Sequence, residues 1–325
     1  SIINNNQGEI RTLNNDLAIT TQQDLINTEG KLIATAQNKI DAGQLDNSKG
    51  LVQAEKNISL TLMNELNNHS GKIITSEDSQ IQAGRLNNQQ GEIGANTLNI
   101  MLSNEANNKK GIILAQDTLH FTAKGIDNSE GSIQSESNMW IDTKGYTLNN
   151  QNTQHSGGII SRIALNLLTG NINNIQGVIN ARKTIDLQGK TVNNLKGQIA
   201  TKANFTAETQ GWNNTSGLIH ALNITINTNK QKLINRDTQD NQGIQASQKL
   251  KLNTGVLDNY KGDIGGKTVL LTTEGLDNGQ GIIDGQTLDL NTGKFTLINQ
   301  LGKISLTEGA DLKTGEINNQ QGLII

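Results

Sequence analysis

The chain has 325 residues, a formal net charge of −3, no cysteine and no proline, and only 2% of its residues are aromatic. The lack of cysteine excludes disulfides and thiolate metal sites, and the scattered, nearly balanced charges argue against a nucleic-acid or anionic-membrane surface. No apolar stretch reaches the roughly 18 residues of a membrane-spanning helix, and no basic start leads into an apolar signal core.

A short phrase, apolar-x-Asn-x-x-Gly, recurs along the whole chain, as in "LDNSKG" at 45–50 and "LNNQQG" at 86–91. The Asn occurs sixteen times at intervals of 19 to 24 residues, and a Gly follows it by three residues in fourteen copies. A repeat of this period indicates a solenoid. The anchors of the sixteen copies are Asn5, Asn27, Asn47, Asn68, Asn88, Asn108, Asn128, Asn150, Asn174, Asn194, Asn214, Asn235, Asn259, Asn278, Asn299 and Asn319.

Three short strands are expected in each copy, taken in chain order. The first ends at the Asn phrase, whose apolar residue lies two positions before the anchor. The second follows the Gly, where an apolar residue such as Ile93 alternates with a small one such as Ala95. The third is an alternating stretch such as "ISLTL" at 58–62. Alternation with a period of two is typical of strands that turn one face inward.

We therefore expect an all-β fold, a right-handed parallel β-helix of about sixteen coils with 20–21 residues and three strands each. One coil cannot bury its apolar face alone, whereas stacked coils can. The absence of proline fits, because every interior amide is needed between coils. The anchors are expected to form a structural ladder that bonds to neighbouring coils. Asn tolerates the left-handed backbone of a corner, and Gly is expected to supply positive φ.

Leucine-rich repeats are the competing fold, since they share a similar period and an Asn column. Their helical or irregular return is not indicated, because the chain lacks convincing 3.6-residue periodicity. The period continues without a composition break, so residues 1–325 are expected to form a single elongated domain. The chain begins and stops within a copy, which suggests a fragment of a longer filament without secretion or toxin domain.

No catalytic, cofactor-binding or metal-ligating residue is predicted. His69, His120, His155 and His220 lack metal-ligand spacing and are interpreted as solvated surface residues. Asp258 and Asp277 occupy the same position in consecutive copies and form the best acidic pair. Asp also replaces Asn singly at this position, so structural substitution is favoured over a cation-binding or catalytic pair.

Two Asn corners are lengthened, after Asn150 and after Asn235. Because insertions in solenoids are frequent sites of partner binding, both are candidate partner-binding loops, although loops also tolerate extra residues. Four coils apart, they are expected to emerge from one edge about 19 Å from each other. The candidate residues are Gln151, Asn152, Thr153, Gln154, His155, Ser156, Arg236, Asp237, Thr238, Gln239, Asp240, Asn241 and Gln242.

The layout "IDNSEGSIQSESNMWIDTKG" at 126–145, repeated as "LDNGQGIIDGQTLDLNTG" at 276–293, resembles the haemagglutinin repeats of filamentous-haemagglutinin-type exoproteins. The resemblance covers essentially the whole chain. It implies a bacterial two-partner-secretion protein, exported unfolded through an outer-membrane transporter and folded outside the cell as a β-helical filament. Family members include adhesins, haemolysins and contact-dependent growth-inhibition toxins. The Asn-Pro motifs of the family's secretion domain have no counterpart here.

Three functions are weighed on these grounds. The first is a rigid extracellular shaft that presents a binding tip or toxin away from the cell. The second is direct adhesion, in which the lateral face or the corner loops bind a host or bacterial receptor. The third, a β-helical carbohydrate-active enzyme, is remote because the outward positions hold no aromatic platform for sugars. We expect no enzyme activity, cofactor, nucleic acid or small-molecule substrate, and a secreted or cell-surface location.

Overall fold

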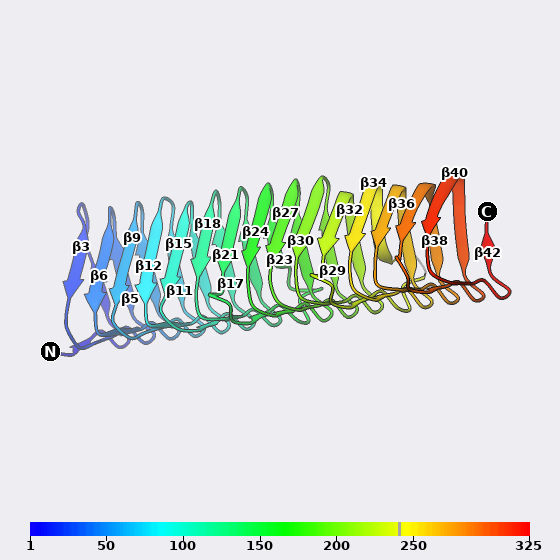
Figure 1. The fold of residues 1–325 in the computed structure, drawn as a ribbon. Helices are drawn as coiled ribbons and strands as arrows, with labels where there is room; N and C mark the ends of the chain where they lie inside the picture. The colour runs from blue at the N-terminus through cyan, green and yellow to red at the C-terminus, as the bar shows by residue number, and fades with distance from the viewer. Residues whose placement is uncertain (240–241) are drawn as a thin grey trace. The chain divides into compact units, whose positions relative to one another are not determined.

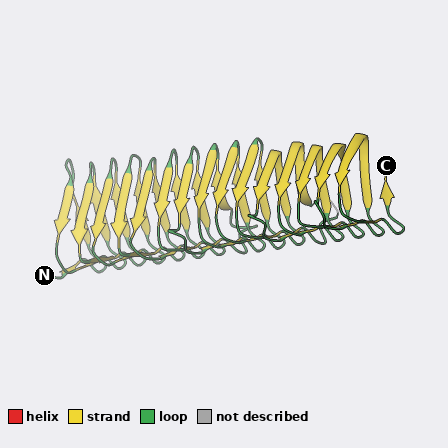
Figure 2. Cartoon of the chain, viewed as in Figure 1, coloured by secondary structure: helices red, strands yellow, loops and turns green. Residues whose placement is uncertain are grey.

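The computed structural model describes residues 1–239 and 242–325, all as strands, turns and loops. The chain divides into two compact units, residues 1–163 with 168–170, and residues 164–167 with 171–325. Strands and loops alone make up the described part of both units (Figure 2). Together the units contain a parallel β-solenoid of about 16 turns, which confirms the predicted fold class.

Unit 1 repeats a coil of three strands, and the equivalent strands of successive coils lie side by side (Figure 1). The first strands are β1 (Ile3–Asn4), β4 (Asp24–Ile26), β7 (Gln44–Asp46), β10 (Glu65–Asn67), β13 (Arg85–Asn87), β16 (Ala106–Asn107), β19 (Ile126–Asp127) and β22 (Leu148–Asn149). The second strands are β2 (Glu9–Arg11), β5 (Lys31–Ala34), β8 (Leu51–Ala54), β11 (Lys72–Thr75), β14 (Glu92–Ala95), β17 (Ile112–Ala115), β20 (Ser132–Ser135) and β23 (Gly158–Ser161). The third strands are β3 (Leu17–Thr20), β6 (Asn38–Ala42), β9 (Ile58–Leu62), β12 (Ser79–Ala83), β15 (Leu98–Leu102), β18 (Leu119–Thr122) and β21 (Met139–Asp142).

Unit 2 repeats the same coil, after β24 (Ala164–Leu168) at the division between the units. Its first strands are β25 (Ile172–Asn173), β28 (Val192–Asn193), β31 (Trp212–Asn213), β33 (Leu233–Ile234), β35 (Leu257–Asp258), β37 (Leu276–Asp277), β39 (Leu297–Ile298) and β41 (Ile317–Asn318). Separate second and third strands are β26 (Val178–Ala181), β27 (Thr184–Gln188), β29 (Gln198–Thr201) and β30 (Asn204–Glu208). The remaining strands are β32 (Leu218–Asn227), β34 (Gly243–Asn253), β36 (Asp263–Thr272), β38 (Ile282–Asn291), β40 (Lys303–Lys313) and β42 (Leu323–Ile324).

From β32 to β40 the expected three strands become two, because the second and third strands merge into one strand of 10 or 11 residues. The corner between them survives as a register shift, between Ala221 and Asn223 where β32 pairs with β34. A single residue, Leu222, lies at that shift, so the ladder of main-chain hydrogen bonds continues on both sides of the corner. Three separate strands therefore describe unit 1 and the start of unit 2.

The core is made of columns in which one apolar side chain per coil stacks on its equivalent in the next. Parallel pairing in strict register places each residue beside its counterpart in the adjacent coil, as Leu66 beside Leu86. One column of the third strands consists of residues no more than 1% exposed, namely Ile40, Leu60, Ile81, Ile100 and Phe121. Such burial is the main favourable contribution to the stability of each coil.

The Asn corner, which follows each first strand, corrects the predicted backbone assignment. In the corners of regular spacing, positive φ belongs neither to the Asn nor to the Gly, but to the residue just before the Gly, such as Gln90 (φ 57°) or Lys110 (φ 56°). The Gly is needed for close approach between coils instead. A Cβ added at Gly91 would lie 2.1 Å from the main-chain oxygen of Asn68 in the preceding coil.

The close approach predicts that Gly91→Ala destabilises the solenoid by about 1–3 kcal/mol, because the coils must separate to admit the methyl group. Gly94→Ala is the matched control, since its Cβ would meet no atom nearer than Cγ2 of Ile74 at 3.8 Å. Urea unfolding followed by circular dichroism measures both. Equal unfolding midpoints for the two variants would contradict the role assigned to Gly91.

Candidate functional site at the Asn corner

The side chains of the anchor asparagines form a chain of hydrogen bonds within each unit. In unit 1 the Nδ2 of each anchor donates to the Oδ1 of the next, from Asn5 to Asn150, at 2.7–2.8 Å. In unit 2 the same bonds run from Asn174 to Asn319 at 2.6–2.8 Å. The bonding partner is the side-chain amide of the next anchor Asn. The sequence predicted a bond to an amide of the neighbouring coil without specifying which one.

Most anchors also donate to main-chain carbonyls of their own coil and the next. The Nδ2 of Asn68 donates to the oxygens of Gly71 and Glu92, both at 3.2 Å. All anchors are buried except Asn319, and those from Asn27 to Asn299 have no exposed surface. A buried amide is tolerated only when its hydrogen bonds are satisfied. The anchors are therefore occupied by structural contacts and offer no surface for a ligand.

In most coils the residue before the anchor is Asn or Asp, and its side chain caps the corner from outside. The Oδ1 of Asn87 accepts the main-chain N–H of Gln89 at 3.2 Å, and the Oδ1 of Asp277 accepts that of Gly279 at 2.9 Å. A carboxylate and an amide oxygen perform this task equally well. This shared role explains why Asn and Asp replace each other at this position, which holds Ile in three copies, Ile26, Ile234 and Ile298.

Asp258 departs from this pattern. It pairs in register with Asp277, as expected, but it is only 2% exposed. Its Oδ2 accepts Nζ of Lys232 at 2.8 Å, and its Oδ1 accepts Nε of Arg236 at 2.7 Å. Both cations belong to the preceding coil and neutralise the carboxylate of Asp258. Asp258 and Asp277 therefore do not form a free acidic pair.

The environment of Asp258 favours its charged form. Burial opposes ionisation, but the hydrogen bonds from Arg236 and Lys232 and their positive charges outweigh it, so the pKa lies below its ordinary value. Reciprocally, the hydrogen bond to Asp258 raises the pKa of Arg236. Asp258 is therefore a buried anion that holds Arg236, the first residue of the second inserted loop.

The two insertions begin in the same way. Thr153 and Thr238 stand where the other corners have Gly, and both are fully buried. A Cβ at the Gly position meets the preceding coil, as at Gly262, where it would lie 2.0 Å from the oxygen of Asn235. With Thr at this position the chain therefore cannot turn directly into the second strand, and the extra residues form a loop that connects the corner to that strand. Substitution of Gly by Thr is the sequence signal for both loops.

The first loop exposes a short polar tip. Thr153 Oγ1 donates to the oxygen of Asn150 at 3.2 Å, and the N–H of Gly157 donates back to the oxygen of Thr153 at 3.0 Å. Asn152 takes the left-handed conformation (φ 58°). Gln154, His155 and Ser156 are exposed, while Gln151 is half-buried. The exposed tip of this loop is thus 154–156.

The second loop is tied to the following coils. Besides the Arg236–Asp258 pair, the guanidinium of Arg236 lies 5.4 Å from the centre of the Tyr260 ring. Nε2 of Gln239 donates to the oxygen of Gln280 at 2.7 Å. Asp237 takes φ 51°, and Gln242 is exposed. The candidates Asp240 and Asn241 lie outside the described residues.

One feature of the outer face escaped the sequence analysis, which expected no aromatic platform. The rings of His120 and Trp140 stack at 4.5 Å with an interplanar angle of 10°, and Trp140 is 38% exposed. Their register pairing and their outward alternation with Phe121 and Ile141 could have revealed the pair. The stack covers one face of each ring.

Among residues 1–239 and 242–325, no group of three or more His, Cys, Asp or Glu side chains could hold a metal ion. In the same ranges no helix is long and apolar enough to cross a membrane.

Comparison with known proteins identifies the family. The haemagglutinin repeat matches residues 3–64, 64–104, 93–145, 140–206, 194–243, 235–299 and 287–325. The chain therefore belongs to the haemagglutinin-repeat family, as its repeats suggested. Proteins of this family are secreted surface adhesins, and a solenoid of such repeats fits an adhesin-type shaft rather than an enzyme. No curated protein and no solved structure matches the chain.

The hydrogen bonds of the anchors predict that Asn88→Asp destabilises the fold by roughly 1–3 kcal/mol. A carboxylate cannot donate to the oxygens of Asn108 and Gly91, which Asn88 now serves. The control is Asn87→Asp, which should change stability by no more than about 0.5 kcal/mol because Asp occupies this outer position in other coils. Chemical unfolding measures both, and an unchanged midpoint for Asn88→Asp would refute the role of the ladder.

The ion pairs of Asp258 predict that Asp258→Asn lowers stability by roughly 1–2 kcal/mol at pH 7, since both cations are half exposed. Because the folded pKa is depressed, this contribution exists above the unfolded pKa and is lost as the pH falls through the folded value. The difference from the wild type should therefore shrink below about pH 4. Asp277→Asn is the control. Urea unfolding at several pH values measures the stability of both variants, and an equal loss of stability in the two would contradict the role of the ion pairs.

Proposed function

We propose that this chain is the rigid extracellular shaft of a large secreted bacterial adhesin or contact-dependent-inhibition-type exoprotein. Its role is to present a binding tip or a toxin away from the producing cell. The carrying observation is the continuous line of Asn side-chain hydrogen bonds in each unit, together with membership of the haemagglutinin-repeat family. Each coil is held by the next through side chains as well as the main chain, which suits a spacer.

The composition also supports the proposed route of export. A chain without cysteine forms no disulfide before secretion, so it can pass unfolded through an outer-membrane two-partner-secretion transporter. Each coil buries its face against its neighbour, so the solenoid can form progressively as the coils emerge. Two expectations from the sequence stay predictions within this proposal. They are that residues 1–325 form a single domain and that both loops emerge from the same edge of the solenoid.

The second candidate function is direct adhesion to a host or bacterial receptor through the corner loops or the lateral face. The second loop favours it, because Arg236 and Tyr260 lie together at its base, and Arg and Tyr are enriched at binding hot spots. The first loop adds the exposed residues Gln154, His155 and Ser156. A carbohydrate-active enzyme has no comparable support.

A cell-binding assay separates the two functions. Under the shaft proposal, the purified chain shows no saturable binding to bacterial or host cells that the full-length secreted protein binds. The variant chain replaces 154–156, Gln239 and Gln242 by Gly and Ser but keeps the buried Thr153 and Thr238, so that the corners still fold. Flow cytometry with labelled protein is the readout.

The control for this assay replaces Gln116 and Gln248, which are exposed and lie outside the Asn corner. Saturable binding by the wild-type chain that disappears in the loop variant and persists in the control would replace the shaft proposal by direct adhesion. Binding that all three proteins share would place the adhesive surface on the lateral face instead.

A further inference from the structure

The corner between the second and third strands of each coil, which we name the far corner, is strongly acidic in unit 1. It comprises the short turns at 12–16, 35–37, 55–57, 76–78, 96–97, 116–118, 136–138 and 162–163. The cations in these turns are Lys56 and Arg162. The anions, all exposed, are Asp16, Glu55, Glu77, Asp78, Asp117 and Glu136.

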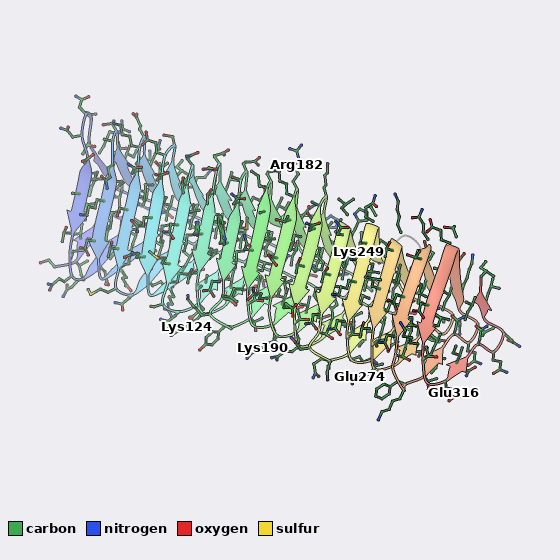
Figure 3. All side chains as sticks on the ribbon, turned by 45° about the horizontal axis from the view of Figure 1, so that its top comes forward. Lys124, Arg182, Lys190, Lys249, Glu274 and Glu316 are labelled. Carbon is green, nitrogen blue, oxygen red and sulfur yellow. The ribbon has the colours of Figure 1, made fainter. Side chains whose placement is uncertain are left out.

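In unit 2 the far corner has the opposite charge. The equivalent positions lie between β26 and β27, between β29 and β30, and at the corners within β32 to β40. Glu308 is the single acidic residue there. The cations, all exposed, are Arg182, Lys183, Lys202, Lys249 and Lys267. Figure 3 shows Arg182 at the edge of unit 2 opposite that of Lys190 and Glu274.

These far-corner charges are largely unneutralised. Among the described residues, one ion pair involves them, between Arg162 Nε and Glu136 Oε2 at 3.3 Å. Elsewhere, several opposite charges on adjacent coils pair along the stack, as Lys72 with Glu92 and Arg85 with Glu65, both at 2.8 Å. Like charges on successive coils, about 4.8 Å apart, repel one another and destabilise the fold.

A surface that accumulates one sign of charge at such a cost is suited to a partner of the opposite sign. A polyanion would account for the basic far corner of unit 2 and leave the acidic far corner of unit 1 unexplained. A second copy of this chain accounts for both. The coils of both units repeat at the same spacing, so the acidic groups of one far corner can lie against the basic groups of another wherever charged coils meet.

We propose that the far corner is a self-association surface, in which the acidic far corner of unit 1 binds the basic far corner of unit 2 of another copy. The charges are exposed, so the association is modest in affinity and strongly dependent on ionic strength. Lateral association of this kind would bundle neighbouring shafts. It does not depend on which binding tip or toxin the proposed shaft carries.

Sedimentation velocity of the full chain over a concentration series tests the proposal. We expect association at about 20 mM salt and its loss at about 500 mM, where screening shortens the range of the charges. Variant A carries Lys202→Glu, Lys249→Glu and Lys267→Glu, and variant B carries Glu77→Lys, Asp117→Lys and Glu136→Lys. Each alone should associate at least about tenfold more weakly than the wild type, because like charges then face each other.

A charge swap makes the test specific. Variants A and B mixed together should associate again, since the acidified unit 2 of A meets the basic unit 1 of B. The matched control carries Lys190→Glu, Lys230→Glu and Lys251→Glu, exposed lysines of unit 2 outside the far corner, and should behave as the wild type. Circular dichroism of every variant establishes that it is folded.

Three outcomes would overturn the proposal. The wild type could remain monomeric at low salt, the control could lose association as fully as variant A, or the mixture of A and B could fail to associate. A parallel titration with a sulfated polysaccharide distinguishes the alternative partner. Binding of that probe by a monomeric wild type, lost in variant A and kept in variant B, would assign the basic far corner to polyanions instead.

Discussion

The structure depends on one close contact that repeats along the coils, where the side-chain amide of an anchor Asn binds the next anchor and, at most corners, a Gly lets the main chains meet. The Asn88–Asn108 bond at 2.7 Å and the space reserved at Gly91 belong to the same corner. A Cβ in place of the Gly would meet the main chain of the preceding coil, and the two corners that carry Thr instead keep the amide contact together with a lengthened loop. The parallel strands and their apolar columns are held in register by this corner.

This corner also limits where function can reside. All its anchors except Asn319 are buried and hydrogen-bonded to their neighbours, so they offer no surface to a partner, and variation must occur around them. The molecule shows two such variations. Thr in place of Gly produces the loops after Asn150 and Asn235, and the far corner accumulates charge of one sign in each unit. Both leave the hydrogen bonds between neighbouring anchors intact.

Several features followed from local pattern, and others did not. The strands, the apolar columns and the Asn corner were predictable because each copy repeats the same spacing, and spacing alone determines which residues face inward. The conformation of the corner was assigned wrongly. Positive φ falls on residues such as Gln90 and Lys110, which carry no sign of it in their type. The merged strands from β32 onward were also missed, because the register shift depends on how neighbouring coils align.

The sequence by itself determined the period, the parallel solenoid and the position of both insertions, since these depend on residue types at fixed local intervals. Only the tertiary structure decided what lies beside what across the coils. Asp258 became a buried anchor because stacking brings Lys232 and Arg236 to it, and His120 met Trp140 for the same reason. Charges that are scattered along the chain form an acidic and a basic far corner, because residues some twenty positions apart become neighbours only when the coils stack.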